Sequence, residues 1–495
     1  MKPKRKILSL LLVICLVAGL MPTAVFAAGT DTGKAIQLGT SGISGYDSAA
    51  GYDYIYFGSW TAQDTYTTSG PIKWRVLDDQ TNTGGTGLFL LSDGLLGTGY
   101  YGGVYFDNTS PYSNTWQGSD AQTWCQDFCS SNFSTGEQSA VLATTKSDEA
   151  FTSTYSLPFA ASENILNEDK VFFLSAEEAE NSAYGFANDN ARIANYGGSA
   201  CAWWLRSPHA YLTNCAGAVY GYGNVDYINV DGDWAARPAF NLDLNSVLFT
   251  SAAVGGKSAN GMDSGLTAIG NYAGNEWKLT LLDKSRSFAV TEQTVSGAPG
   301  GTITLNYTGA TTGTNEYISV IIADSSGAQY YGRVAQQTDT DGTVEITIPS
   351  GLADGTYTLY VFSEQYNGGE QDDTKLTDYA SAFETVALTV SSDTTASPAA
   401  LDFGSKTVDY TEAPAAQTVT IKNIGKRSVT VDLPTSAKYT ITAGTGFENG
   451  AATLASDDTA TFTVQPNTGL DVGDYSETLT ISGSNGTSAS GKLSF

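Results

Sequence analysis

The sequence predicts a mostly β, multidomain protein, in which an α+β N-terminal domain is followed by two β-sandwiches. Short alternating strand patterns, separated by glycine-rich turns, run along most of the chain, which contains 54 glycines. Helical patterns are confined to two short stretches. At 495 residues the chain is also too long for one ordinary domain, and about three domains fit the usual size range.

Residues 1–27 have the three-part layout of a secretory signal peptide. A cationic start is followed by the apolar run 7–21 and by small residues at Val25 and Ala27, ahead of an expected cleavage site. The run is shorter than the roughly 20 residues that a spanning helix needs. We therefore expect a secreted or cell-surface protein, extracellular in either case, with no membrane span after signal removal.

The charge balance narrows the class of partner. Lys and Arg total 24 against 51 Asp and Glu, a net charge of −27. Because such a surface repels polyanions, nucleic acid and anionic lipid are poor partners.

Four cysteines remain once the signal peptide is removed. In an exported chain they are disulfide candidates with three possible connectivities. Their spacings, C-x3-C and C-x13-C, fit no common zinc pattern. The only histidine, His209, leaves little scope for His-based metal sites or catalytic triads. The disulfide candidates are Cys125, Cys129, Cys201 and Cys215.

The N-terminal domain, residues 28–245, combines many strands with two helices. A helix is expected from Ser119 to about Phe133, with Ser119 and Gln122 forming a capping box. A second helix is expected at Ser175, with Glu178 three residues on. Gly223-Asn224 fits a two-residue hairpin turn. Strands are expected at 52–58, 72–77, 88–91, 171–174, 203–206, 216–222, 225–230 and 235–244.

The second half of the chain is expected to be all β. Residues 246–285 form a connector that adds strands, and 286–391 and 396–495 each have the strand pattern of an immunoglobulin-like sandwich. Tyr357 follows Asp and Gly as in a tyrosine corner, and Tyr475 repeats this arrangement.

Several motifs of the N-terminal domain occur in the order found in an exported bacterial family of unknown function. They are Phe57-Gly58, Trp74-Arg75-Val76-Leu77, Ser119 to Cys125, Lys170 to Ser175, Trp203-Trp204-Leu205-Arg206-Ser207-Pro208 and Arg237-Pro238-Ala239-Phe240. The domain resembles that family across some 200 residues. The resemblance implies a C-type-lectin-like fold, shared with formylglycine-generating enzymes. The last unit, with Leu401-Asp402-Phe403-Gly404, resembles bacterial immunoglobulin-like modules.

Residues 209–234 carry the main functional candidate. Tyrosines, asparagines and glycines alternate there, a composition typical of binding surfaces because Tyr offers large contact area at low entropy cost. The alternative is an ordinary twisted hairpin whose tyrosines only cover the sheet. The candidate ligand-binding residues are Tyr211, Asn214, Tyr220, Tyr222, Asn224, Asp226, Tyr227 and Trp234.

Other notable residues are expected to be structural. Adjacent Trp203 and Trp204 point to opposite faces of a strand, and the core is the better expectation for both. Arg206 and Arg237 lie in apolar motifs and should be buried clamps. Trp124 lies on the apolar face of the first helix.

No cofactor is expected. Asp231-Gly232-Asp233 with Asn229 offers oxygens for Ca²⁺, but a hairpin turn is the favoured interpretation.

These observations favour a protein that binds an unknown glycan or protein ligand, as in adhesion at a bacterial surface, and that is not an enzyme. One alternative is a formylglycine-generating-enzyme-like oxidase that holds copper with Cys201 and Cys215, which flank the Trp203 motif. The other is a purely structural surface or spacer protein.

Overall fold

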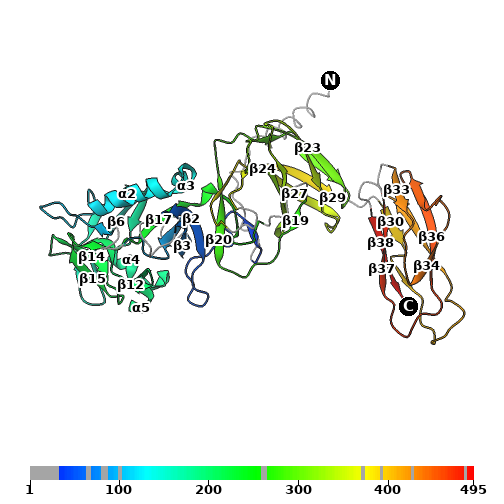
Figure 1. Ribbon diagram of the computed structural model, residues 1–495, viewed down its shortest axis with the longest axis horizontal. Helices are drawn as coiled ribbons and strands as arrows, with labels where there is room; N and C mark the ends of the chain where they lie inside the picture. Colours follow the sequence, from blue (N-terminus) through cyan, green and yellow to red (C-terminus); the bar gives the residue numbers. More distant parts are fainter. Residues whose placement is uncertain are drawn as a thin grey trace, which may run out of the picture.

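The computed structural model describes residues 33–62, 69–79, 87–97, 103–257, 265–368, 374–390, 394–424, 428–483 and 488–495. The predicted signal peptide lies outside these ranges. Strands dominate and helices are few, which confirms the mostly β, multidomain class. Along the long axis of Figure 1 lie a head (residues 33–246), a middle module (289–390) and a C-terminal module (394–495), with a junction (247–282) after the head.

The head holds most of the short strands and the helices. Its strands are β2 (Tyr54–Trp60), β3 (Gly70–Asp78), β4 (Gly87–Ser92), β5 (Val104–Tyr105), β6 (Thr144–Asp148), β7 (Phe151–Thr152), β8 (Pro158–Phe159), β9 (Ser162–Asp169), β10 (Val171–Phe173), β11 (Asn195–Tyr196), β12 (Ser199–Ala200), β13 (Trp203–Pro208), β14 (Cys215–Val219), β15 (Val225–Asn229), β16 (Asp233–Trp234) and β17 (Pro238–Asp243). The preceding strand, β1 (Ile36–Leu38), lies away from the rest of the head, because it pairs with the junction and Ile36 packs with residues of the middle module. Its helices are α2 (Asp120–Asn132), α3 (Thr135–Ala140), α4 (Ala176–Ala179) and α5 (Asp189–Arg192), with 3-10 turns η1 (Ser182–Tyr184) and η2 (Leu244–Ser246).

Both expected helices begin directly after the serines that the capping patterns predicted, Ser119 and Ser175. Ser119 caps α2 by accepting from the N–H of Gln122 at 3.0 Å. The predicted reciprocal bond is wrong, because the Gln122 side chain accepts from Gly118 instead. In α4 the box is complete: Ser175 and Glu178 each cap the other's backbone N–H. Sequence patterns therefore set the helix starts, although α4 is only four residues long.

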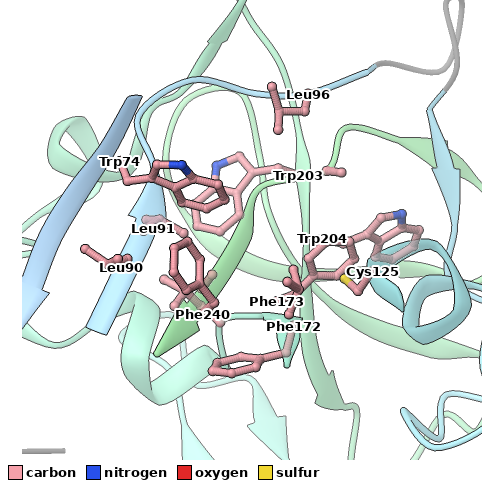
Figure 2. Close-up of a cluster of buried hydrophobic side chains, with 14 of the residues drawn as sticks. Trp74, Leu90, Leu91, Leu96, Cys125, Phe172, Phe173, Trp203, Trp204 and Phe240 are labelled. Carbon is pink, nitrogen blue, oxygen red and sulfur yellow. The ribbon is translucent and has the colours of Figure 1, made fainter. Parts of the chain in front are cut away.

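One aromatic cluster forms the core of the head (Figure 2). Trp74 packs edge-on against Phe240 with ring centroids 4.7 Å apart. Trp203 and Trp204 are both fully buried. The Trp204 indole N–H donates to the Val104 carbonyl at 2.6 Å, so its one polar atom is satisfied. This core fixes β13, the strand from which the candidate surface is built.

The residues expected to be a connector form the junction between the head and the middle module. They supply β18 (Val247–Ala252), β19 (Thr267–Ala268) and β20 (Glu276–Leu282). β18 runs antiparallel along one edge of β20. On its other edge, the first residues of β20 pair in parallel with β2 of the head. The last residues of β20 pair in parallel with β28 of the middle module. Among the described residues, fifteen strands thus join one sheet that crosses from head to middle module.

The middle module places two sheets around a shared apolar core. The smaller sheet has the order β21-β23-β26, and the other belongs to the sheet shared with the head. The strands are β21 (Ala289–Val290), β22 (Thr294–Gly297), β23 (Thr302–Thr308), β24 (Glu316–Asp324), β25 (Gly327–Gln336), β26 (Gly342–Thr347), β27 (Gly355–Gln365), β28 (Asp378–Ala380) and β29 (Glu384–Val390).

The C-terminal module has its own apolar core and its own sheets. The strands are β30 (Thr394–Ser397), β31 (Ala400–Asp402), β32 (Gln417–Asn423), β33 (Val429–Asp432), β34 (Tyr439–Ala443), β35 (Ala451–Leu454), β36 (Thr459–Pro466), β37 (Glu477–Ser482) and β38 (Ser488–Ser494). In the two modules Tyr357 and Tyr475 donate to the carbonyls of Ala353 and Asp471, at 2.9 and 2.7 Å. These are the backward bonds expected of tyrosine corners.

Candidate ligand-binding surface

Most of the predicted ligand-binding residues lie on the three-stranded sheet β13-β14-β15 and its loops. Gly217 lies opposite Tyr227, and Val219 lies opposite Val225. The hairpin closes through residues 220–224, so the expected two-residue turn is wrong. A two-residue type I′ turn needs positive φ at both central residues, whereas here only Gly223 has it, at +96°.

Five ring side chains form an aromatic row along this hairpin, made of two groups of touching rings that one hydrogen bond connects. The His209 ring lies 6.2 Å from that of Tyr211 and 4.3 Å from that of Tyr227. The Tyr220 hydroxyl donates to the Tyr227 carbonyl at 3.5 Å, and its ring lies 5.8 Å from that of Tyr222. The structure therefore brings together all four predicted tyrosines, with His209 between two of them.

The two ends of the aromatic row face solvent. Tyr211 is 80% exposed and Tyr222 is 67% exposed, while Tyr220 and Tyr227 are half-buried. Large exposed rings at both ends of a row offer flat apolar contact area with a hydroxyl at the tip. The half-buried middle of the row holds them on the sheet.

His209 helps to fix the loop that carries Tyr211. Its Nδ1 accepts from the backbone N–H groups of Tyr211 and Leu212, both at 3.1 Å. Burial lowers the pKa of the imidazole, while Asp226 raises it less. Because Nδ1 acts as an acceptor, the ring is the neutral tautomer that carries its proton on Nε2. His209 therefore has a structural role beneath Tyr211.

The other four predicted residues have different positions. Asn214 is exposed beside the row. Asn224 is buried in the loop and donates to Asp226 at 3.2 Å. Trp234 belongs to β16, which pairs with β5, and packs on the head core. Trp234 is therefore better described as a core-packing residue than as part of the row.

Sequence reasoning missed the residue that positions the 220–224 loop. Arg192, buried at the end of α5, donates to the Gly223 carbonyl at 2.7 Å and to the Phe186 carbonyl at 3.2 Å. It also forms an ion pair with Asp189. The spacing Asp189, Arg192 is a helical i, i+3 pair, which was the available signal. Arg192 thus ties the loop to α5.

A groove adjoins this end of the row. Asp189 accepts from the hydroxyl of Tyr155, whose ring is itself exposed. The backbone of Asp189 packs directly on Gly223. The groove has a volume of about 510 Å³, and its lining includes Tyr155, Asn188, Asp189 and Asn190. Aromatic and amide groups therefore extend the surface beyond the hairpin.

Replacing Gly223 by alanine is expected to displace the 220–224 loop and to destabilise the head by at least about 1–2 kcal/mol, the cost of the left-handed backbone. An added Cβ would also lie 1.9 Å from the Asp189 carbonyl oxygen. The control is Gly198→Ala, because Gly198 has a similar φ of +85° with nothing within 4 Å. Denaturant unfolding should show the larger loss for Gly223→Ala. Equal losses would mean that the Asp189 contact does not matter.

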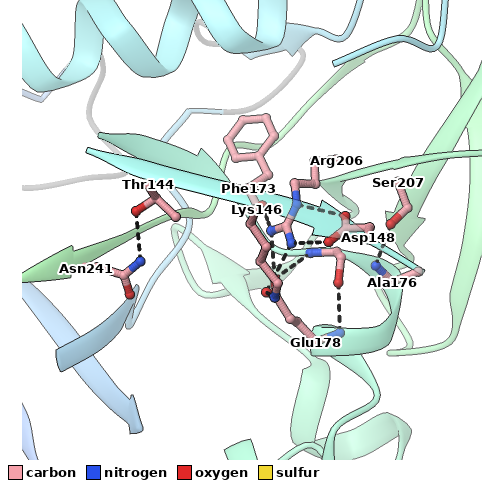
Figure 3. A network of polar contacts seen from close by, with 10 residues as sticks. Thr144, Lys146, Asp148, Phe173, Ala176, Glu178, Arg206, Ser207 and Asn241 are labelled. Atoms are coloured by element: carbon pink, nitrogen blue, oxygen red, sulfur yellow. Dashed lines mark hydrogen bonds and ion pairs between the residues drawn. The ribbon is translucent and has the colours of Figure 1, made fainter. Parts of the chain in front are cut away.

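A buried ionic network lies beneath the sheet (Figure 3). Arg206 of β13 donates two bonds to Asp148, at 2.8 and 3.0 Å, and two to Glu178, at 2.7 and 3.0 Å. Burial alone would raise the pKa of Glu178, but the charges of Arg206 and Lys146 outweigh it and lower that pKa to about 2. The network locks β13 to β6 and α4.

Arg237 is held differently. It is fully buried, donates to the Ser92 and Asp93 carbonyls at 3.1 and 3.4 Å, and lies over the Trp203 ring at 5.0 Å. Burial, with the nearby charge of Arg75, lowers its pKa to about 9. The two arginines expected as clamps therefore use different partners, carboxylates for Arg206 and carbonyls for Arg237.

The four cysteines of the described chain carry free thiols, so the structure does not contain the disulfides considered from the sequence. Cys125 and Cys129 are buried on α2, beside the partly buried Trp124. Cys215 donates to Asn229 at 3.2 Å. Cys201 lies near Gly221, past the far end of β14, and β14 itself extends roughly 13 Å from Cys215. This separation does not suit a copper ion shared by the two.

Asp231-Gly232-Asp233 forms a turn in which Gly232 N–H donates to the Asn229 carbonyl at 3.0 Å. Burial raises the pKa of Asp233. Within the described ranges, no group of three or more His, Cys, Asp or Glu is placed to hold a metal ion. In the same ranges no helix has the length and apolarity to cross a membrane.

A larger hollow lies elsewhere on the head and was missed by sequence reasoning. Its volume is about 1020 Å³, and its lining includes Tyr46, Tyr52, Asp53, Tyr184 and Asn275. Segments far apart in the sequence meet there, so no local pattern marks it. It is the competing location for a ligand.

The aromatic row and the Arg206 network both lie within the part of the head that matches a known family, from the start of β4 to η2. A domain of unknown function, DUF6273, spans residues 87–244. The DUF6273 domain thus contains every predicted ligand-binding residue, whereas β2 and β3, which complete its sheet, precede it.

Comparison with solved structures adds no fold assignment. The chain is 12% identical to elastase-activated alpha-2-macroglobulin of Escherichia coli over 55% of this chain and 27% of that one, with a TM-score of 0.20. It is 13% identical to a Salmonella alpha-2-macroglobulin mutant over 55% of this chain and 20% of that one, with a TM-score of 0.22. It is 10% identical to a Porphyromonas gingivalis protein of unknown function over 42% of this chain and 99% of that one, with a TM-score of 0.15. No curated protein matches the chain.

Proposed function

We propose that the chain is an exported surface or secreted protein whose head, a C-type-lectin-like domain, binds a glycan or protein ligand through the aromatic row. The two following modules, of immunoglobulin-like fold, would display the head. The proposal is supported above all by the solvent-facing rings of Tyr211 and Tyr222 at the two ends of the row.

The chemistry of the row suits such ligands. Tyrosine rings stack on the apolar faces of sugars and pack on protein side chains, while their hydroxyls exchange hydrogen bonds with either ligand. Asn188, Asp189 and Asn190 in the adjoining groove add polar groups that can fix the orientation of a ligand. The net charge of −27 favours neutral or basic ligands over acidic ones.

The test is an array of glycans and cell-surface proteins probed with the purified chain. We expect binding that Tyr220→Ala combined with Tyr222→Ala reduces at least about 100-fold, the size expected for loss of two hot-spot side chains. The matched control, Tyr222→Phe, keeps the ring and should retain most of the affinity. Circular dichroism checks that each variant is folded.

Two outcomes would contradict the proposal. One is an array without any bound ligand, which would favour a structural spacer. The other is a ligand whose affinity is unchanged by the Tyr220→Ala, Tyr222→Ala double substitution, which would place binding elsewhere on the chain.

A further inference from the structure

Four charged side chains meet in the interior where the junction joins the middle module. They form the buried ion cluster, which consists of Lys257, Lys278, Glu364 and Asp378, and each is fully buried. Lys278 comes from β20, Glu364 from β27 and Asp378 from β28. The cluster therefore lies on the shared sheet, away from the aromatic row.

Lys257 is the centre of this cluster. Its Nζ lies 2.6 Å from Glu364 Oε1, 2.7 Å from Asp378 Oδ2 and 2.6 Å from Thr280 Oγ1. The same nitrogen lies over the Phe249 ring, 4.5 Å from its centroid. An amine is thus held against two carboxyl groups in a pocket with an aromatic wall.

Keeping these buried groups in their charged forms costs free energy. Each buried charge loses several kcal/mol of hydration, which ion pairing recovers only in part. An amide between an amine and a carboxyl group would remove one positive and one negative charge together. Burial favours the neutral forms of both groups, which are the reacting forms, but the opposite charges of the cluster outweigh it, raising the pKa of Lys257 and lowering that of Asp378.

The two carboxyl groups of the cluster have different surroundings. Asp378 receives Lys278 Nζ at 3.1 Å on Oδ2 and the N–H of Asn367 at 2.6 Å on Oδ1. These donors withdraw electrons from its carboxyl carbon and stabilise an oxyanion. Glu364 instead accepts from the hydroxyls of Ser319 and Tyr331. Asp378 is therefore suited to be the electrophile and Glu364 to be the base.

We propose that Lys257 and Asp378 condense spontaneously into an intramolecular amide, with Glu364 carrying the protons. Two carboxylates hold the pKa of Lys257 above its ordinary value despite burial, so Nζ becomes nucleophilic only after it gives up a proton. Glu364 takes that proton, and the Nζ lone pair adds to the Asp378 carboxyl carbon. A second Nζ proton and the one on Glu364 leave with the departing oxygen as water. The step is redox-neutral and needs no co-reactant.

The amide would join residues that are 121 positions apart. It would fasten the junction covalently to β28, at the point where the sheet passes from head to middle module. A chain displayed outside the cell would gain resistance to unfolding and to proteolysis, as a long closed loop restricts the unfolded state.

Mass spectrometry of the purified chain, with its N-terminus fixed by sequencing, tests the proposal. We expect the intact mass to be lower than the sequence mass by one water molecule. Peptide mapping should find no tryptic cleavage after Lys257 and a branched peptide that joins it to the Asp378 peptide. A chain at full sequence mass, or a water loss mapped to any other pair, would overturn the proposal.

Variants separate the roles of the two carboxyl groups. Asp378→Ala and Glu364→Gln should both restore the full mass, and both should lower the melting temperature. Lys73→Arg, which changes a partly exposed lysine outside the cluster, should keep the water loss. A Glu364→Gln chain that is folded by circular dichroism yet fully cross-linked would show that Glu364 is not the base.

Discussion

Replacing Arg206 by methionine is expected to destabilise the head by about 3–5 kcal/mol, the cost of leaving buried charges unpaired. Methionine fills most of the arginine volume, but Asp148 loses both of its bonds from Arg206 and Glu178 keeps only Lys146 as a charged partner. Denaturant unfolding followed by tryptophan fluorescence measures the loss. All eight tryptophans lie between residues 60 and 277, so the signal reports the head and the junction.

Arg237→Met is the matched control for this experiment. Arg237 is equally buried in the same core, but its hydrogen-bond partners are carbonyl groups. Its removal therefore leaves no carboxylate unpaired, and the loss of stability should be clearly smaller. If the two substitutions cost the same, the Arg206 network contributes packing rather than charge pairing.

Acid is expected to weaken the head by about 3 kcal/mol through Glu178 alone. Its pKa is lowered from 4.5 to about 2 in the folded state, and each pKa unit corresponds to about 1.4 kcal/mol. Because the folded pKa is the lower one, this stabilisation is fully present above about pH 4.5 and is lost as the pH falls toward 2. Unfolding free energies measured across this range should show the decline.

Glu178→Gln isolates the contribution of this one carboxyl group. The variant should be less stable at neutral pH but should lose less further stability between pH 4.5 and 2. Acidic groups outside the Arg206 network have the same surroundings in both proteins, so the difference between the two curves reports Glu178 and this network. Parallel curves would show that Glu178 is not held as a buried carboxylate by Arg206 and Lys146.

Local patterns predicted much of the fold. Ser119 and Ser175 start the two helices because their side chains satisfy N–H groups that the helix itself leaves free. The burial of Trp203 and Trp204 follows from an apolar strand covered on both faces. The gathering of the tyrosines of 209–227 likewise follows from hairpin pairing, which is local in sequence.

Features that depend on distant contacts were not visible in the sequence. The parallel pairing of β20 with β2 joins residues 222 positions apart, and its pairing with β28 joins residues 98 positions apart. No local rule specifies such a partner. Arg192 positions the 220–224 loop from α5, and Trp234 packs on the core because β16 pairs with β5. In each case tertiary contacts decide the role of a residue whose own neighbourhood is uninformative.

The most direct test of ligand binding by the aromatic row is hydrogen exchange of the chain with and without the strongest ligand from the array. Protection confined to residues 209–230, together with 153–157 and 186–192 around the groove, is the predicted result. Unchanged exchange there, with protection of the hollow at residues 44–53 and 181–184 instead, would contradict binding by the aromatic row.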